Sequence, residues 1–163
     1  MSQRAELPML APAVRRLQSF RGISLHNAMV LATEIADWRR FERPSQLSCY
    51  LGLVSREYSS GDRERRGSIT KAGNSHCRLV LIQATWCYRH RPATGVDLKR
   101  RQSGQPPGVI AHAWKAQQRL HQRFNHLAYR KAPQIAVVAV ARELVGLLWS
   151  VMQDLEPNRH QAA

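Results

Sequence analysis

Apolar residues recur every three or four positions along most of this chain, a spacing that predicts amphipathic α-helices. A first helix is predicted to open at Pro12 and to end at Gly22, and a second to begin with Ser24 as its N-cap. The positions predicted to be buried are Val14, Leu17 and Phe20 in the first helix and Ala28, Leu31 and Ile35 in the second. A tight turn around Gly22 joins the two helices.

The pattern changes between Leu53 and Thr70. This stretch is polar, contains glycines and has no helical apolar period, so it predicts an irregular polar loop or a small β-hairpin. A short helix from Pro44 to Leu51 is predicted before it, and a helix from about Asn74 to Tyr88 after it.

The remainder of the chain predicts a linker followed by two long helices. Residues 91–108 hold three prolines and the basic run Lys99-Arg100-Arg101, a composition typical of a linker. Helices are then predicted over about residues 108–131 and 133–152. The fold class is therefore mainly α: a helix–hairpin–helix-like amino-terminal part, the polar loop or hairpin, and long antiparallel helices. We expect a core with the helix–hairpin–helix and the serine-containing loop over residues 10–90, the linker over 91–108 and a carboxy-terminal helical hairpin over 109–155.

The charge points to a polyanionic partner. The chain has 25 Lys and Arg against 11 Asp and Glu, a net charge of +14 and an isoelectric point near 11.1. Self-repulsion on this scale destabilises a compact fold unless a polyanion neutralises it, so nucleic acid is the expected partner. A basic protein that is merely soluble is the alternative, and charge alone does not exclude it.

Other compositional features narrow the class. The three cysteines have spacings that suit neither a zinc site nor a disulfide framework, which indicates a reducing cytoplasm. Residues 135–152 come closest to a membrane span, but Arg142 and Glu143 interrupt them at helical spacing, so we expect a packed helix and no membrane partner. Acids and histidines form no cluster with metal-ligand spacing, so no metal or other cofactor is expected in this chain.

The Gly22 turn is the first candidate binding feature. In a helix–hairpin–helix element, backbone N–H groups of the turn and the next helix bind a phosphate, and glycine allows close approach. Arg21 and Ser24 would take part in such a site. An ordinary αα-hairpin closed by a glycine explains the same spacing, and the spacing alone favours it.

The polar stretch after Tyr58 is the second candidate feature. It contains Ser59-Ser60-Gly61, and a serine hydroxyl can attack a DNA phosphodiester and hold the strand as a phosphoester. Cations and a helix N-terminus would stabilise the charge on the transferring phosphoryl group. Candidates for that task are Arg63, Arg65, Arg66, Lys71 and Asn74. A solvated polar turn is the alternative, and Ser-Ser-Gly by itself favours it.

A basic stripe on the predicted helix over about residues 108–131 is the third candidate binding feature. Its members recur every three or four residues, opposite the apolar seam of the helix: Lys115, Arg119, Arg123, His126 and Arg130. Between Arg89 and Lys131 the only acid is Asp97, so no acid within this region is available to pair the stripe. The stripe therefore favours phosphate binding over the simpler interpretation, a solvated helix face.

An ordered series of motifs resembles a known family. It runs through Phe20-Arg21-Gly22-Ile23-Ser24, Glu34-Ile35-Ala36-Asp37, Tyr50-Leu51-Gly52-Leu53, Ser59-Ser60-Gly61, Gly67-Ser68-Ile69-Thr70-Lys71-Ala72-Gly73-Asn74, Arg78 and Ile135-Ala136 to Glu143-Leu144. Together these resemble the carboxy-terminal half of the DEDD-type insertion-sequence transposases, the family that includes the Piv DNA invertases. The resemblance covers most of residues 14–153.

The resemblance implies a DNA recombinase. In that family an amino-terminal RuvC-like domain holds Mg²⁺ through an acidic tetrad, the carboxy-terminal domain supplies a nucleophilic serine, and a structured bridge RNA guides the enzyme to DNA. The nucleophile would be Ser60, directly before the glycine, and Arg78 would join the candidate nucleic-acid contacts. Expected partners are DNA, guide RNA and a RuvC-like domain or full-length transposase protomers in a homo-oligomeric complex.

Two departures limit this expectation. The sequence contains no acidic tetrad, and Val54-Ser55 stands where the family usually has a proline. We therefore expect the chain by itself to bind nucleic acid without recombining DNA, Mg²⁺ being bound only together with the missing RuvC-like half. The rival hypotheses are a stand-alone, non-catalytic nucleic-acid-binding protein and a helical interaction domain whose charge only confers solubility.

Overall fold

A computed structural model describes the backbone of residues 3–60 and 63–155 and the side chains of residues 8–55 and 68–155. The described elements, in chain order, are α1 (Gln3–Leu17), α2 (Leu25–Ile35), the 3₁₀ helix η1 (Trp38–Arg40), α3 (Pro44–Tyr50), β1 (Ser55–Ser60), β2 (Arg63–Ile69), α4 (Ser75–Thr85), the 3₁₀ helix η2 (Trp86–Arg89), α5 (Val96–Gln102), α6 (Pro107–Ala128) and α7 (Pro133–Met152). The prediction of a mainly α fold is confirmed.

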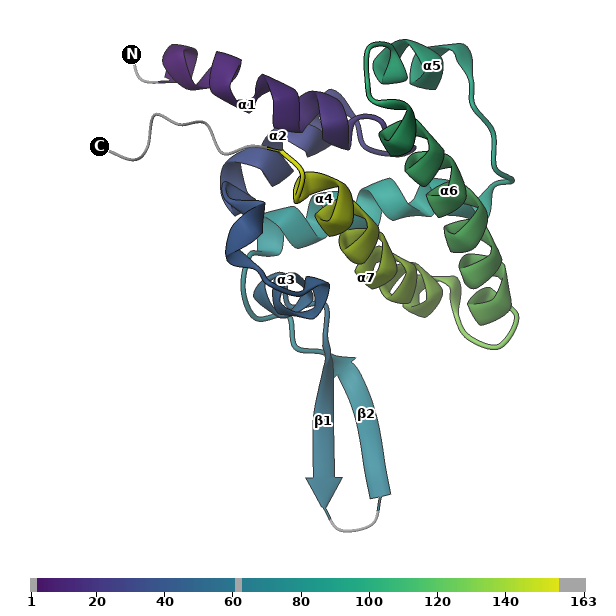
Figure 1. Cartoon of the computed structure of the whole chain (residues 1–163). Helices are drawn as coiled ribbons and strands as arrows, with labels where there is room; N and C mark the ends of the chain where they lie inside the picture. Colours follow the sequence, from purple (N-terminus) through teal and green to yellow (C-terminus); the bar gives the residue numbers. More distant parts are fainter. Residues whose placement is uncertain (1–2, 61–62, 156–163) are drawn as a thin grey trace.

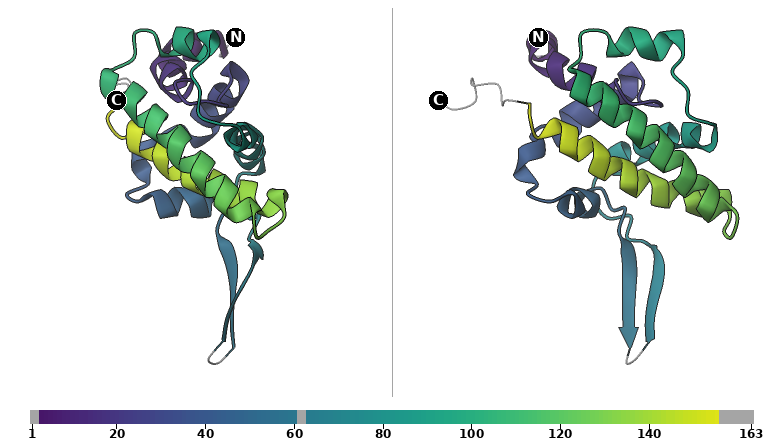
Figure 2. Two further views of the ribbon diagram at one scale, coloured as in Figure 1. Left: turned by 90° about the vertical axis from the view of Figure 1, so that its right-hand side faces the viewer. Right: turned by 45° about the vertical axis from the view of Figure 1, so that its right-hand side comes forward.

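Helix α7 is the centre of the helical body. It packs against α6, α3, α4 and the end of α1, and α6 lies alongside it in all three views (Figures 1 and 2). Leu144 and Leu148 are fully buried in it. Among the described helices, α7 alone is long and apolar enough to cross a membrane, with a mean hydropathy of 1.9, but half of the window is buried in the fold. These contacts make it a core helix.

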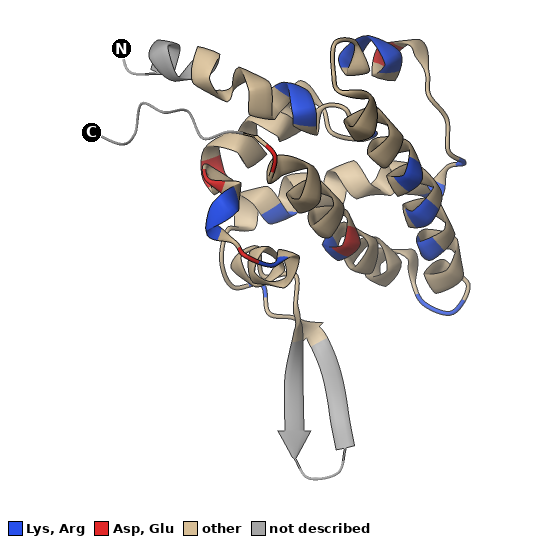
Figure 3. Ribbon diagram, viewed as in Figure 1, with Lys and Arg blue, Asp and Glu red and all other residues tan. Residues whose placement is uncertain are grey.

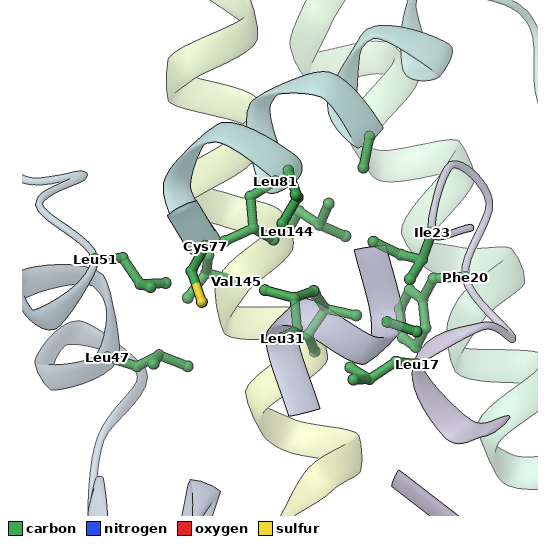
Figure 4. Packing of buried hydrophobic residues seen from close by; sticks show 14 of the residues in the cluster. Leu17, Phe20, Ile23, Leu31, Leu47, Leu51, Cys77, Leu81, Leu144 and Val145 are labelled. Atoms are coloured by element: carbon green, nitrogen blue, oxygen red, sulfur yellow. The ribbon is translucent and has the colours of Figure 1, made fainter. Parts of the chain in front are cut away.

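One hydrophobic core draws on nearly every helix. Figure 4 shows side chains from α2, α3, α4 and α7 converging on one another and on the turn after α1. The buried positions predicted for the first two helices, Val14, Leu17, Phe20, Ala28, Leu31 and Ile35, all belong to this core. Burial of such apolar surface is the main force that holds the helices together.

The first helix differs from its predicted limits. It begins at Gln3, with Pro8 and Pro12 inside it, and it ends at Leu17, so Phe20 and Gly22 lie in the following turn. The predicted opening at Pro12 is wrong because the helix continues through this proline, which only removes the backbone hydrogen bond that its own N–H would have donated. Both prolines are exposed.

The second helix begins as predicted. The Ser24 side chain accepts a hydrogen bond of 3.2 Å from the backbone N–H of Asn27, which is the N-cap interaction expected from its position. The later helices also lie close to their predicted limits, with α7 starting at Pro133 and α3 at Pro44.

A helix occupies the middle of the segment predicted to be a linker. Helix α5 buries Leu98, and the side-chain amide of Gln102 donates to the carbonyl of Ser19 over 2.9 Å. The segment 91–108 is thus fastened to the turn after α1. Residues of 10–90 and of 109–155 contribute to the same hydrophobic core.

The polar stretch forms an antiparallel β-hairpin, one of the two alternatives that its sequence allowed. Strands β1 and β2 pair from Ser55 opposite Ile69 to Ser60 opposite Arg63, with an irregularity between Ser55 and Glu57. The hairpin projects from the helical body, and the three views agree on this (Figures 1 and 2).

Candidate nucleic-acid interface

The backbone of Ser60 lies at the end of β1, opposite Arg63 of β2. Tyr58 is opposite Arg65, and Glu57 is opposite Arg66. The side chains of these residues lie outside the described part of the structure, so the predicted roles of Ser60, Arg63, Arg65 and Arg66 remain predictions. What the backbone establishes is that this sequence is carried at the far end of a projecting hairpin (Figure 1).

Two glycines hold the base of the hairpin against the helical body. Gly52 and Gly73 have φ angles of +67° and +86°, and each faces the backbone of the other segment. A Cβ on Gly52 would lie 1.9 Å from the carbonyl oxygen of Ala72, and one on Gly73 would lie 1.9 Å from that of Tyr50. No other residue fits either position without displacing the backbone, so the base of the hairpin is a fixed mount.

Hydrogen bonds complete this mount. The N–H of Lys71 donates to Gly52 O over 3.2 Å, and the N–H of Asn74 donates to Tyr50 O over 3.2 Å. The guanidinium of Arg78 donates to the carbonyls of Leu51, at 3.0 Å, and Ala72, at 3.4 Å. Arg78, predicted to contact nucleic acid, is therefore occupied in joining the two sides of the hairpin base.

Asn74 and Lys71 differ in their availability. The Asn74 side chain caps α4 by accepting from Cys77 N at 2.9 Å, and its amide donates to the Glu34 carboxylate at 2.8 Å. Lys71 is exposed, and no described residue pairs with its ammonium group. Of the predicted contacts at the hairpin base, Lys71 is the one whose side chain has no partner among the described residues, and phosphate binding by Lys71, Asn74 and Arg78 remains a prediction.

The Gly22 turn is packed into the protein. A Cβ on Gly22, whose φ is +85°, would lie 2.2 Å from Ala84 O and 2.8 Å from the sulfur of Cys87. Its missing side chain thus makes room for the end of α4. The buried hydroxyl of Tyr88 donates to Arg21 O over 2.8 Å, and Arg101 donates to Ile23 O over 2.5 Å. These contacts are those of a structural αα-hairpin.

The side chains of Arg21 and Ser24 in that turn have different surroundings. The Arg21 guanidinium donates to Arg91 O over 2.8 Å and so holds the segment after η2. Ser24 is exposed, but its hydroxyl oxygen caps α2. Phosphate binding at Gly22, Arg21 and Ser24 remains a prediction, and in this structure these groups serve the protein's own packing.

Burial also makes the thiols of this region inert. Burial raises the pKa of the Cys77 thiol to about 12, with the Glu34 carboxylate adding to the shift, and it raises the pKa of Cys87 to about 11. Both thiols stay protonated at neutral pH, and a protonated thiol is a weak nucleophile. Neither competes with the serine as a candidate for covalent chemistry.

The outer face of α6 presents the predicted basic stripe to solvent. Lys115, Arg119, Arg123 and His126 are exposed on α6, and Arg130 is exposed in the turn after it. Figure 3 marks Lys and Arg positions in blue along α6 and in this turn. The opposite face buries Ala113, Ala116, Leu120 and Phe124. The predicted division of this helix into an apolar and a basic face is therefore confirmed.

One acid reaches the stripe from the neighbouring helix. Glu143 of α7 pairs with Nε of Arg119 and lies 3.8 Å from Nε of Arg123. The sequence region of the stripe contains no such acid, and α7 supplies it across the helix pair. A signal was present in the family motif, which includes Glu143, but only packing reveals which arginines it meets.

Comparison with known proteins gives a consistent result. Residues 14–94 match the model of the transposase IS116/IS110/IS902 family. The chain is 42% identical over 146 residues to a putative transposase, y4qE, of Sinorhizobium fredii, covering 89% of this chain and 37% of the relative. It is 38% identical over 145 residues to the transposase for insertion sequence element IS1111A of Coxiella burnetii, covering 89% of this chain and 34% of the relative.

A third relative is the transposase for insertion sequence element IS1533 of Leptospira borgpetersenii, 32% identical over 117 residues, with 68% of this chain and 32% of the relative covered. No solved structure is significantly similar to the chain. The chain spans about a third of the length of the curated relatives that it matches. The matched family model and these relatives together place the chain in the IS116/IS110/IS902 family of insertion-sequence transposases.

Proposed function

We propose that this chain is the DNA-binding, serine-bearing part of an insertion-sequence transposase and that Ser60 is its nucleophile. The observation that carries the proposal is the hairpin: the backbone of Ser60 ends a strand that projects from the helical body, opposite Arg63, on a base fixed by Gly52 and Gly73. A rigid mount holds a projecting nucleophile at a defined distance from a bound strand.

The chemistry requires few groups. The Ser60 hydroxyl loses its proton and its oxygen forms a bond to phosphorus, while the bond from phosphorus to one strand oxygen breaks and that oxygen takes up a proton. The strand is then held as a phosphoester, which conserves the bond for transfer to another strand end. Cations of Arg63, Arg65 and Arg66, which flank the turn in sequence, would stabilise the charge on the phosphoryl group.

We also propose that a RuvC-like domain outside this chain holds any Mg²⁺. Among the described residues, no group of three or more His, Cys, Asp or Glu side chains could hold a metal ion. The partners in this proposal are Mg²⁺ with its RuvC-like domain, guide RNA and other transposase protomers. Alone, the chain should bind nucleic acid without exchanging strands.

The test combines the chain with the RuvC-like domain of a relative, or with a full-length relative inactivated at its own serine. Ser60→Ala should abolish strand exchange and any covalent protein–DNA adduct while leaving DNA affinity unchanged. Ser59→Ala, one residue away in the same strand, is the matched control and should retain activity. Recombination by Ser60→Ala at the wild-type rate would show that the nucleophile is assigned wrongly.

A second candidate is a stand-alone nucleic-acid-binding protein, which the exposed cations of α6 favour. It predicts binding that falls steeply with salt, because counterions are released, and that survives Ser60→Ala, with no covalent adduct under any partner condition. Absence of DNA and RNA binding at low salt would instead favour a helical interaction domain.

A further inference from the structure

The α6 cations continue into the turn that joins α6 to α7. Lys115, Arg119 and Arg123 are each separated by four residues, a rise of about 6 Å along the helix. Arg130 and Lys131 follow in the turn, both exposed. No described residue pairs with the side chains of Lys115, Arg130 or Lys131. We call these five residues the α6 track.

Glu143 does not remove Arg119 and Arg123 from this track. It approaches each guanidinium at Nε, and the arginine side chains remain 69% and 49% exposed. Their terminal nitrogens donate no hydrogen bond to a described residue. A carboxylate that binds at Nε leaves the N–H groups of the terminal nitrogens available to bind a phosphate.

An aromatic side chain stands at the end of the track. Tyr129 is 90% exposed, whereas Tyr88 is 1% exposed and Tyr50 lies in a contact with Arg40 and Phe41. Tyr129 is the C-cap of α6, three residues or about one helical turn beyond His126, and it directly precedes Arg130 in the chain, so it stands at the carboxy-terminal end of the track. No described side chain covers its ring.

We infer that the α6 track and Tyr129 bind single-stranded nucleic acid, with the cations contacting the backbone and the Tyr129 ring stacking on an unpaired base. This deepens the proposed function, on which it rests. Aromatic rings beside a row of cations are the means by which proteins bind single strands, because every base offers a face for stacking. A paired base inside a duplex offers no such face.

The two contributions leave different experimental signatures. Each phosphate contact adds to the dependence of affinity on salt, because it releases counterions. Stacking does not change the number of phosphates neutralised. Loss of the ring should therefore weaken binding at every salt concentration and leave the slope unchanged, whereas loss of a track cation should lower the slope.

The experiment measures binding of the full chain by fluorescence anisotropy over a range of salt. The probes are a thymidine DNA oligonucleotide, a uridine RNA oligonucleotide and a DNA duplex. The variants are Tyr129→Leu, Tyr129→Phe, and Ile135→Ala as a control at another exposed apolar position (56%) just beyond the same turn. Circular dichroism confirms that each variant is folded.

We expect Tyr129→Leu to weaken single-strand binding roughly 5- to 100-fold, the value of one stacked base, without changing the salt slope or duplex affinity. Tyr129→Phe should restore binding, and Ile135→Ala should resemble the wild type. Whichever single-stranded probe, DNA or RNA, loses affinity in Tyr129→Leu identifies the kind of strand that this surface binds. An equal loss on duplex and single strands, or no loss, overturns the inference but leaves the proposed function standing. Wild-type protein that binds none of the probes overturns both.

Discussion

The arginines of this protein fall into two groups that use the same side chain in opposite ways. Around the Gly22 turn and the hairpin base, the guanidinium groups of Arg21, Arg78 and Arg101 donate to backbone carbonyls of distant segments. On α6, Arg119 and Arg123 face solvent beside Lys115, with a single shared acid, Glu143. The first group holds the fold together, and the second is available to a partner.

This difference shows that the net charge overstates the number of cations available to bind a partner. A charge of +14 suggests a protein covered with phosphate contacts, yet several arginines have their donors committed to carbonyls that would otherwise lack partners. Hydrogen bonds from a charged donor are worth about 1.5–3 kcal/mol, so these side chains contribute to stability first. The count of cations available for binding is smaller than the composition implies.

The largest expected effect lies at the fixed base of the hairpin. Gly73→Ala should lower the free energy of unfolding by about 3 kcal/mol or prevent folding, because its Cβ would meet Tyr50 O and its φ is positive. Gly108→Ala is the control, since nothing lies within 4 Å of a Cβ there. Urea unfolding followed by circular dichroism measures both, and equal stability of the two variants would contradict a rigid mount.

The next largest effect is expected from replacing an arginine that donates to backbone carbonyls inside the protein. Arg101→Met removes the hydrogen bonds to Gln18 O and Ile23 O and should cost about 2 kcal/mol of stability, with little change in the salt slope of nucleic-acid binding. Its neighbour Arg100, which is 80% exposed, provides the control: Arg100→Met should change stability by less than about 0.5 kcal/mol. If the two variants were equally stable, the inward group would not be structural.

The outward cations should show the reverse pattern. Lys115→Gln or Arg123→Gln should lower the slope of log K against log salt by about 1 and weaken binding at all sequences alike. Stability should change by no more than about 0.5 kcal/mol, because both side chains are exposed. A salt titration and an unfolding curve on the same samples provide the measurement. An unchanged slope would mean that α6 does not contact phosphates.

The smallest effect is expected where the outward group meets its acid. Glu143→Gln removes a negative charge from beside Arg119 and Arg123 and should strengthen binding at low salt by about 0.5 kcal/mol, the scale of a surface ion pair. The gain should disappear at high salt, since exposed charges are screened there. Weaker binding would indicate that Glu143 positions the two arginines for the strand.

Local patterns predicted the helices well. Ser24 caps α2, Pro133 starts α7, and the two faces of α6 agree with its apolar and basic residues, because each depends on neighbours within about one turn. The predicted start of the amino-terminal helix at Pro12 is wrong, because a proline is typical of a helix start but also lies inside this helix. For the polar stretch the sequence allows both a loop and a hairpin, because its strands have no alternating apolar face.

The candidate site was predictable by residue type and less so by role. Arg78 and Asn74 were sensible phosphate ligands in the sequence, yet the structure shows them bound to Leu51 O, Ala72 O and Glu34. The family motif includes Glu143 but does not connect it to α6, because its partners Arg123 and Arg119 lie 20 and 24 residues away in the chain. Such pairings arise from helix packing, which no local spacing encodes.

The sequence by itself determined the helical periodicity, the excess of positive charge, the glycines of the tight turns and the motifs that identify the family. Those properties are local or compositional, so they can be read one segment at a time. Only the tertiary structure decided that Gly22 and Gly73 face protein backbone and that Arg101 points inward while Lys115 and Tyr129 point outward. The physical reason is that a cationic side chain or a glycine backbone contacts whichever group the packing of the chain brings next to it. That group can be a carbonyl of the same chain or a phosphate of another molecule.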